Sequence, residues 1–154
     1  MPPKLTKTKK LLLAATRKHM KKSRAVSWLG FEVEDVEVGR AVLRMNAVAH
    51  HKQLNGVVHG GILAAMADTA AAIAAYTQIP AGAALATIEL KINYLQSVPG
   101  GRIKADARVL RAGRNFLVTE CEIFDAKGAL AAKALLTFGA ASGHSLQKSS
   151  ESRQ

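Results

Sequence analysis

The chain has 154 residues, 49% of them hydrophobic and only 5% aromatic, which is typical of one globular domain and excludes a chain that is disordered throughout. Its single cysteine, Cys121, excludes an internal disulfide, so nothing requires an oxidising compartment and we expect a cytoplasmic protein. The excess of 22 Lys and Arg over 11 Asp and Glu gives a net charge of +11, which favours a polyanionic partner without deciding between nucleic acid, anionic lipid and a phosphorylated small molecule.

Residues 1–27 are expected to be a basic segment that is largely helical and peripheral to the rest of the chain. Nine of the Lys and Arg residues precede the first acid, Glu32. The apolar stretch 11–15 is too short for a signal peptide and far below the roughly 20 residues of a membrane helix. The segment offers one helix at most, whereas a helix-turn-helix needs two. Nucleic acid is therefore not an expected partner, and membrane contact of this segment stays an alternative.

Two short strands are expected next, at 28–37 and 40–45, separated by a turn at Gly39. The longest regular element predicted is a helix over 60–78, in which alanine, the best helix former, occurs at eight positions. The residues of this helix are apolar nearly all round, so it should be buried on most sides.

Four further strands follow, each predicted from apolar residues that alternate with polar ones and from the turns that separate the runs. They span 85–95, 102–111, 115–124 and 130–138. Cys121 occupies an apolar position of the third of these strands, where a small buried thiol is expected rather than a nucleophile. The polar tail 141–154 is expected to lie outside the folded domain.

One long buried helix beside sequential strands with short connections predicts an α+β domain over 28–140, in which an antiparallel sheet wraps around one long central helix. The edge strands of such a sheet carry unpaired backbone groups, and pairing with a second subunit is the usual way to cover them. We therefore expect an obligate homodimer or a higher oligomer, with dimers that pair into a tetramer.

Asp68 is the one charged residue in the predicted helix. Burying an isolated carboxylate is costly, so Asp68 should be hydrogen-bonded, protonated or functional. At the start of the helix, Gly60 and Gly61 present backbone N–H groups without side chains in front of them, at the positive end of the helix dipole. Such groups suit a carbonyl oxygen that develops negative charge. The alternatives are a carboxylate that is held by loop amides or faces solvent, and a tight turn that merely requires glycine.

The spacing of these two features predicts a site shared between subunits. Gly60 and Asp68 lie eight residues apart, which is about 12 Å along a helix. A catalytic carboxylate must approach the atom it attacks to about 3–3.5 Å or act through one water. One copy of the helix therefore cannot supply both groups to one carbonyl, whereas two antiparallel copies across a dimer axis can.

The stretch 51–69, HKQLNGVVHGGILAAMADT, resembles the signature of the PaaI-like hotdog-fold acyl-CoA thioesterases, and the resemblance extends over about 28–138. It implies a hotdog fold and the hydrolysis of an acyl- or aryl-CoA thioester to free acid and coenzyme A. No metal and no cofactor are implied, because coenzyme A is part of the substrate. Two alternatives stay open: a dehydratase acting on 3-hydroxyacyl thioesters, and a non-catalytic module that binds acyl-CoA.

The resemblance implies four catalytic residues. Asp68 would be the nucleophile or general base, and the Gly60 amide would polarise the thioester carbonyl. Gln53 would position the attacking water or the leaving group, and Thr87 would hold the lytic water. Some relatives carry a hydroxyl one turn after the acid, where this chain has Ala72, so the hydroxyl role depends on Thr87.

The resemblance also implies a set of substrate-binding residues at the helix start, in one strand and at one turn. The turn at 111–114 is expected to lie beside the coenzyme A phosphates. The substrate-binding set is His59, which would orient the glycine turn, with Gly61, Asn55, Tyr94, Arg111, Gly113 and Arg114.

His50 and His51 lack further ligands at metal spacing, so we expect solvated loop residues rather than a metal site.

Overall fold

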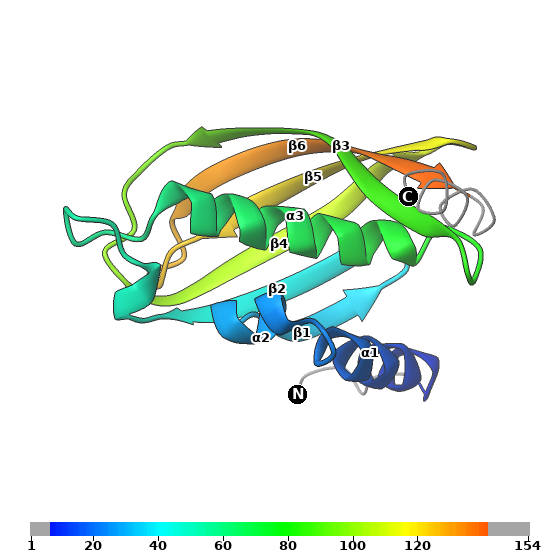
Figure 1. Cartoon of the computed structure of the whole chain (residues 1–154), viewed down its shortest axis with the longest axis horizontal. Coiled ribbons are helices and arrows are strands. Elements are labelled where there is room, and N and C mark those ends of the chain that lie inside the picture. The colour runs from blue at the N-terminus through cyan, green and yellow to red at the C-terminus, as the bar shows by residue number, and fades with distance from the viewer. Residues whose placement is uncertain (1–6, 142–154) are drawn as a thin grey trace, which may run out of the picture.

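The computed structural model describes residues 7–141, which form a six-stranded sheet curled around one long helix (Figure 1). In chain order the elements are α1 (Lys7–Met20), α2 (Arg24–Leu29), β1 (Glu32–Glu37), β2 (Arg40–Ala47), the 3-10 helix η1 (Ala49–His51), α3 (Gly60–Tyr76), β3 (Ala84–Tyr94), β4 (Gly101–Ala112), β5 (Phe116–Phe124) and β6 (Leu130–Ala141). The predicted α+β architecture is confirmed. The polar tail, from residue 142 onward, lies outside the described residues.

The strands are ordered β1-β2-β4-β5-β6-β3, and each neighbouring pair is antiparallel. β4, β5 and β6 are adjacent and joined by short turns, as their alternating residues predicted. β3 does not pair with β4, which follows it in the chain, but joins the far side of β6. The two edges of the sheet are therefore β1 and β3. α3 lies across one face of the sheet and contacts the strands from β2 to β3.

α3 packs one face across the sheet and leaves another face open. The buried face includes Leu63, Met66 and Ile73, and most of its other members are alanines. The helix is buried over the face that packs on the sheet, and a stripe of residues spaced three and four apart stays partly accessible to solvent. This open stripe consists of Ile62, Ala65, Thr69, Ala72 and Tyr76, of which Tyr76 is 50% exposed.

The N-terminal segment holds two helices rather than one, and the first strand starts later than predicted. Ser23 caps α2, since its Oγ accepts a hydrogen bond from the Val26 N–H at 3.3 Å. Gly30 ends α2 in the left-handed conformation, with φ of 68°. Trp28, expected to open a strand, lies in this helix, and β1 begins at Glu32.

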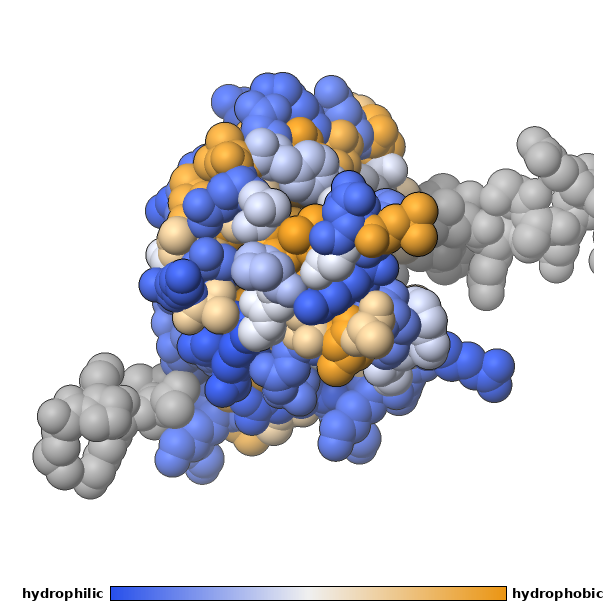
Figure 2. Space-filling view, turned by 90° about the vertical axis from the view of Figure 1, so that its left-hand side faces the viewer, coloured by the Kyte–Doolittle hydropathy of each residue, from blue (hydrophilic) through white to orange (hydrophobic). Residues whose placement is uncertain are grey.

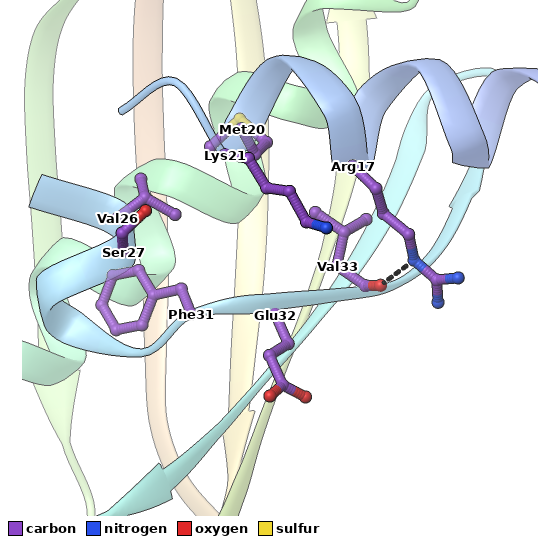
Figure 3. Close-up of a pocket in the computed structure, with 8 residues that line it drawn as sticks. All are labelled: Arg17, Met20, Lys21, Val26, Ser27, Phe31, Glu32 and Val33. Atoms are coloured by element: carbon purple, nitrogen blue, oxygen red, sulfur yellow. Dashed lines mark hydrogen bonds between the residues drawn. The ribbon is translucent and has the colours of Figure 1, made fainter. Parts of the chain in front are cut away.

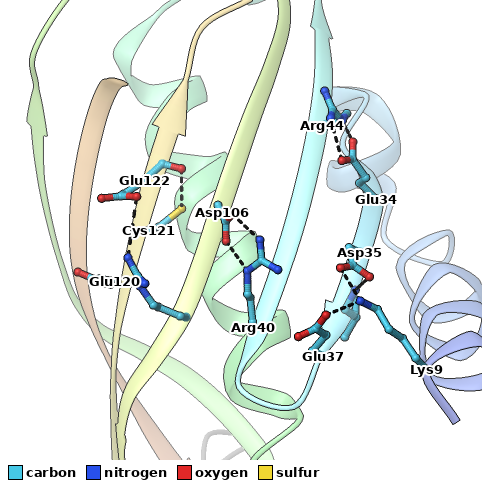
Figure 4. A network of polar contacts seen from close by, with 12 residues as sticks. Lys9, Glu34, Asp35, Glu37, Arg40, Arg44, Asp106, Glu120, Cys121 and Glu122 are labelled. Atoms are coloured by element: carbon cyan, nitrogen blue, oxygen red, sulfur yellow. Dashed lines mark hydrogen bonds and ion pairs between the residues drawn. The ribbon is translucent and has the colours of Figure 1, made fainter. Parts of the chain in front are cut away.

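α1 is packed against the edge strand β1 (Figures 3 and 4). Three side chains of its inner face contact the core: Leu12, Leu13 and Met20. Arg17 Nε donates a hydrogen bond to the Val33 carbonyl at 2.8 Å. Lys9 Nζ lies 2.8 Å from the Asp35 carboxylate and also pairs with Glu37.

Cys121 is fully buried in β5, as the alternating pattern predicted. Desolvation by burial raises the pKa of its thiol to about 12, so the sulfur stays protonated near neutral pH and is not a nucleophile. On the neighbouring strands, Arg40 of β2 donates two hydrogen bonds to the Asp106 carboxylate of β4, at 2.9 and 2.7 Å.

Among residues 7–141, no helix has both the length and the apolar character needed to cross a membrane.

Candidate active site

Asp68 and Thr87 meet where the edge strand β3 passes the central helix. Asp68 lies partly buried in the middle of α3, and Thr87 Oγ1 donates a hydrogen bond to its Oδ1 at 2.7 Å. A β-bulge shifts the register of β3 against β6 between Thr87 and Glu89. Bulges re-aim side chains and are common beside active sites. The Thr87 hydroxyl therefore faces the acid, as the hydroxyl role requires.

The Asp68 carboxylate is held by this one hydroxyl. The ion pairs of the described residues all involve other acids, and no backbone amide in that part of the chain donates to Asp68. The alternative of a carboxylate held by loop amides is thus wrong. One carboxylate oxygen is fixed by Thr87, and the other is available to a water or a substrate.

The start of α3 presents an unpaired amide. His59 caps the helix, because its Nδ1 accepts a hydrogen bond from the Gly61 N–H at 2.9 Å. The Gly60 N–H has no acceptor among residues 7–141, and it lies at the positive end of a 17-residue helix. Gly60, rather than Gly61, is therefore the amide that can receive an oxyanion.

Tyr94 covers the same turn from the end of β3. Its hydroxyl donates to the Gly60 carbonyl at 2.7 Å, and a Cβ at position 60 would lie 2.9 Å from the Tyr94 Cζ. Burial raises the pKa of the Tyr94 phenol above its ordinary value, so the hydroxyl stays a donor at neutral pH. Glycine at position 60 thus keeps the amide unobstructed and leaves room for the tyrosine ring.

Gln53 and Asn55 lie in the loop that leads into α3. An isolated bridge between Lys52 and Val58 closes this loop at its base. Inside the loop, Gln53 Oε1 accepts a hydrogen bond from the Asn55 N–H at 3.2 Å. The Gln53 side chain therefore stabilises the loop to which it belongs. Asn55 is exposed.

His51 is buried, so the expectation of a solvated loop histidine is wrong for this residue. It is only 2% exposed, its Nδ1 accepts from the Val48 N–H at 3.1 Å, and its carbonyl accepts from the His59 N–H at 2.8 Å. Burial lowers the pKa of His51 below its ordinary value and keeps the ring neutral. His51 thus ties the loop to the capping residue of α3. His50, the same residue type one position earlier, is exposed. The local sequence therefore does not show which of the two histidines is buried.

Arg111 lies at the end of β4, and Gly113 and Arg114 lie in the exposed turn between β4 and β5. The Gly113 N–H donates to the Phe116 carbonyl at 2.8 Å, and a Cβ at position 113 would lie 2.8 Å from the same oxygen, so the turn requires glycine. In the part of the chain that the structure describes, neither arginine forms an ion pair. Both guanidinium groups are therefore available to an anionic ligand.

This turn lies toward the same end of the sheet as Thr87. Thr87 of β3 and Leu117 of β5 pair with Phe138 from opposite sides of β6. Gly60 and Tyr94 lie toward the other end of β3. Within one chain, the Asp68–Thr87 pair thus lies toward the turn that carries Arg114. The Gly60 amide lies toward the opposite end of the sheet.

A cleft of about 370 Å³ opens beside the start of α3. Gly60 and Tyr94 line it, together with the apolar Val58, Leu63, Leu95 and Val98. Figure 2 looks onto the end of the molecule where α3 begins, and apolar patches lie there among hydrophilic residues. The four apolar residues were not predicted as part of the site, because local sequence does not distinguish a cleft wall from a core residue.

Comparisons with known proteins agree with the fold and the motif. A profile of the thioesterase superfamily matches residues 55–132. A 1,4-dihydroxy-2-naphthoyl-CoA hydrolase of Listeria monocytogenes is 31% identical over 97 residues, which cover 63% of this chain and 79% of that protein. The thioesterase HI1161 of Haemophilus influenzae is similar in structure, with a TM-score of 0.80 and 26% identity over 85% of this chain and 91% of that one.

A further solved structure shares the fold at lower identity. The Escherichia coli PaaI protein of the phenylacetic acid degradation operon has a TM-score of 0.80 and 24% identity, over 88% of this chain and 96% of that one. The hotdog fold implied by the 51–69 motif is confirmed by these structures and by the sheet that wraps α3. The chain belongs to the thioesterase superfamily, as a PaaI-like enzyme of the hotdog fold that hydrolyses thioesters.

Proposed function

We propose that the protein hydrolyses an acyl- or aryl-CoA thioester to the free acid and coenzyme A, at a site composed from two subunits. The observation that carries this proposal is the separation of the two reactive features within one chain. The Asp68–Thr87 pair lies eight residues along α3 from the Gly60 amide, which is about 12 Å. A single thioester carbonyl cannot contact both, so a second subunit supplies the missing half.

Two open surfaces support pairing through β3 and α3. β3 is an edge strand of 11 residues, and its Ile88 is 61% exposed. The open stripe of α3 has small residues at its centre, Ala65, Thr69 and Ala72, which permit a close approach of a second helix. A twofold axis beside β3 would join two sheets edge to edge and set two copies of α3 antiparallel. Gly60 of one copy would then approach Asp68 of the other.

The chemistry of this composite site follows from the groups it contains. The thioester oxygen accepts a hydrogen bond from the Gly60 N–H, and the helix dipole stabilises its developing negative charge. Asp68 of the other subunit either attacks the carbonyl carbon, which gives an acyl–Asp68 anhydride that water then hydrolyses, or takes a proton from a water that attacks this carbon. Thr87 orients the carboxylate in both routes. The carbon–sulfur bond breaks, and the thiolate of coenzyme A leaves and takes up a proton. Either route consumes one water for each thioester.

The remaining groups suit the two ends of an acyl-CoA. Guanidinium groups bind phosphate through paired hydrogen bonds, so Arg111 and Arg114 suit the nucleotide of coenzyme A. The cleft beside Gly60 has apolar walls and suits the acyl group. The dehydratase alternative has less support, because it needs a histidine that exchanges protons. His59 Nδ1 is engaged by the Gly61 amide, and His51 is buried.

A thiol-release assay across short, long, branched and aryl CoA esters tests this proposal, with Asp68→Asn as the decisive variant. The amide keeps the shape of the side chain and can still accept the Thr87 hydrogen bond, so the fold and the assembly should be unchanged. Loss of the carboxylate should lower kcat by several powers of ten with little change in KM. A variant that keeps about a tenth of wild-type kcat would exclude Asp68 as the catalytic group. Enoyl product in place of free thiol would favour the dehydratase.

A further inference from the structure

α1 has an outer face that takes no part in the proposed reaction. Residues three and four apart share one side of a helix, and the inner side of α1 packs on β1 (Figure 3). On the opposite side, Lys7, Lys10 and Lys18 are exposed together with Leu11 and Ala14. Leu11, one turn after Lys7, is 63% exposed. This set of five residues is the outer face of α1.

The charge of the outer face is uncompensated. The chain contains no acid before Glu32, so α1 and α2 are entirely basic or neutral. The acids of β1 nearest to α1 are paired with Lys9 of its inner side (Figure 4). Within residues 7–141, Lys7, Lys10 and Lys18 form no ion pair. Such a strip attracts polyanions.

α1 lies at the sheet edge opposite the strand that carries Thr87 of its own chain. α1 lies on β1, whereas Thr87 lies on β3, and these strands are the two opposite edges of the sheet. Five strand spacings separate them, roughly 24 Å along the sheet. Pairing of subunits through β3 would therefore leave the outer face of α1 accessible, and an anion bound there would not obstruct the site.

We propose that the outer face of α1 docks the enzyme on an anionic lipid surface. Lysine is a compact point charge that suits the diffuse negative potential of a membrane, whereas recognition of individual nucleic-acid phosphates favours the fork of arginine. Leu11 adds an exposed apolar group to the face, which a lipid headgroup layer can bury and a nucleic-acid backbone cannot. The enzyme would thus act close to the surface into which acyl chains partition.

Vesicle flotation tests the proposal with the full-length protein. The vesicles are phosphatidylcholine alone, or phosphatidylcholine with a minority of phosphatidylglycerol, at low salt and at roughly 0.15 M salt. The test variant carries Lys7→Gln, Lys10→Gln and Lys18→Gln, since glutamine forms helices about as well as lysine. The matched control removes the same charge from exposed positions in other elements: Lys52→Gln, Arg102→Gln and Lys127→Gln.

The wild-type protein should bind only the anionic vesicles, and less at the higher salt. The test variant should lose about a hundred-fold in partitioning, because each lysine near the surface contributes roughly a factor of five. The control should lose a few-fold at most, because charges beyond a Debye length are screened. Leu11→Ser should weaken binding without changing its salt dependence.

Three results would overturn the proposal. They are absence of binding to anionic vesicles at low salt, equal losses in the two triple variants, and binding of duplex DNA that anionic vesicles do not displace. Thermal unfolding and hydrolysis of a water-soluble acyl-CoA check that both triple variants are folded. Because these readouts do not depend on the identity of the substrate, failure of the lipid proposal and failure of the proposed reaction are distinguishable.

Discussion

Thr87 donates a 2.7 Å hydrogen bond to Asp68 between an edge strand and the central helix of the same chain. The two residues lie 19 positions apart in the sequence, and the bulge in β3 accompanies their contact. Because β3 is also the strand that we propose pairs with a second subunit, assembly would fix the strand that positions the acid. The orientation of Asp68 and the oligomeric state are therefore expected to be linked.

Replacing Thr87 by valine should lower kcat about 10- to 100-fold, because a hydrogen bond to a charged group contributes roughly 1.5–3 kcal/mol. Valine has the shape of threonine without the hydroxyl, so the packing of β3 should be retained. Steady-state thiol release measures the effect, and Thr87→Ser is the matched control that keeps the donor. A serine variant as slow as the valine variant would show that Thr87 acts through packing rather than through its hydroxyl.

The buried His51 predicts a loss of stability in mild acid. Its pKa is lowered in the folded state, so the unfolded chain binds a proton first as the pH falls through about 6.5. The stability contributed by the neutral ring is thus present above that pH and is lost below it, by up to about 1.4 kcal/mol for each pH unit until the folded-state pKa is reached.

The measurement is urea unfolding of the wild type and of His51→Asn between mildly acidic and neutral pH. Asparagine can accept the Val48 N–H in place of the Nδ1 and does not titrate. The difference in unfolding free energy between the two proteins should shrink as the pH falls. A difference that stays constant would contradict burial of a neutral ring.

Deleting residues 1–22 should destabilise the domain, because α1 packs against β1. Removal of α1 uncovers apolar surface that Leu12, Leu13 and Met20 now cover. We expect a cost of at least about 2 kcal/mol, which corresponds to a fall in Tm of roughly 4–8 °C. Below that transition, hydrolysis of soluble substrates should continue, because α1 is at the edge opposite β3. Lys9→Met, which breaks only the ion pairs, should lower Tm less.

The fold could be predicted from the sequence where structure is local and periodic. In β5, the period of two fixes which residues face the core, and it placed Cys121 inside correctly. α2 was missed although Ser23 and Gly30 are standard cap residues, because the apolar run after Ser27 also suits a strand. The pairing of β3 with β6 is non-local, and no pattern within either strand encodes it.

The site could be predicted from the sequence as a motif but not as a geometry. The spacing of Gly60 and Asp68 along one helix predicts that they do not share a carbonyl within a chain. The contacts of Tyr94 with Gly60 and of Thr87 with Asp68 depend on the path of β3. The burial of His51 depends on the packing of α2 and the 51–59 loop, which local composition does not report.

The composite site predicts that two inactive variants complement each other. Asp68→Asn lacks the carboxylate and keeps the amide, whereas Gly60→Pro lacks the amide donor and keeps the carboxylate. In a mixed dimer, one site receives both defects and the other receives neither. Subunit exchange should therefore restore activity to about half of the wild-type level per dimer, if the two sites act independently.

A matched control separates loss of the amide from distortion of the turn. Any Cβ at position 60 would press on the Tyr94 ring, at 2.9 Å from its Cζ, so Gly60→Ala imposes the same contact while it keeps the N–H. If the amide is the reactive group, Gly60→Ala should retain much more activity than Gly60→Pro. Size-exclusion chromatography and thermal unfolding establish that each parent variant folds and assembles before it is mixed.

The outcome discriminates between the two arrangements because they predict opposite results from the same mixture. If Asp68 and Gly60 served one carbonyl within a chain, each site of the mixed dimer would carry a defect, and the mixture would stay inactive. If they act across the interface, activity should rise as subunits exchange, and it should follow the fraction of heterodimer isolated by two different affinity tags. Purified heterodimers of folded parents that release no thiol would exclude the shared site.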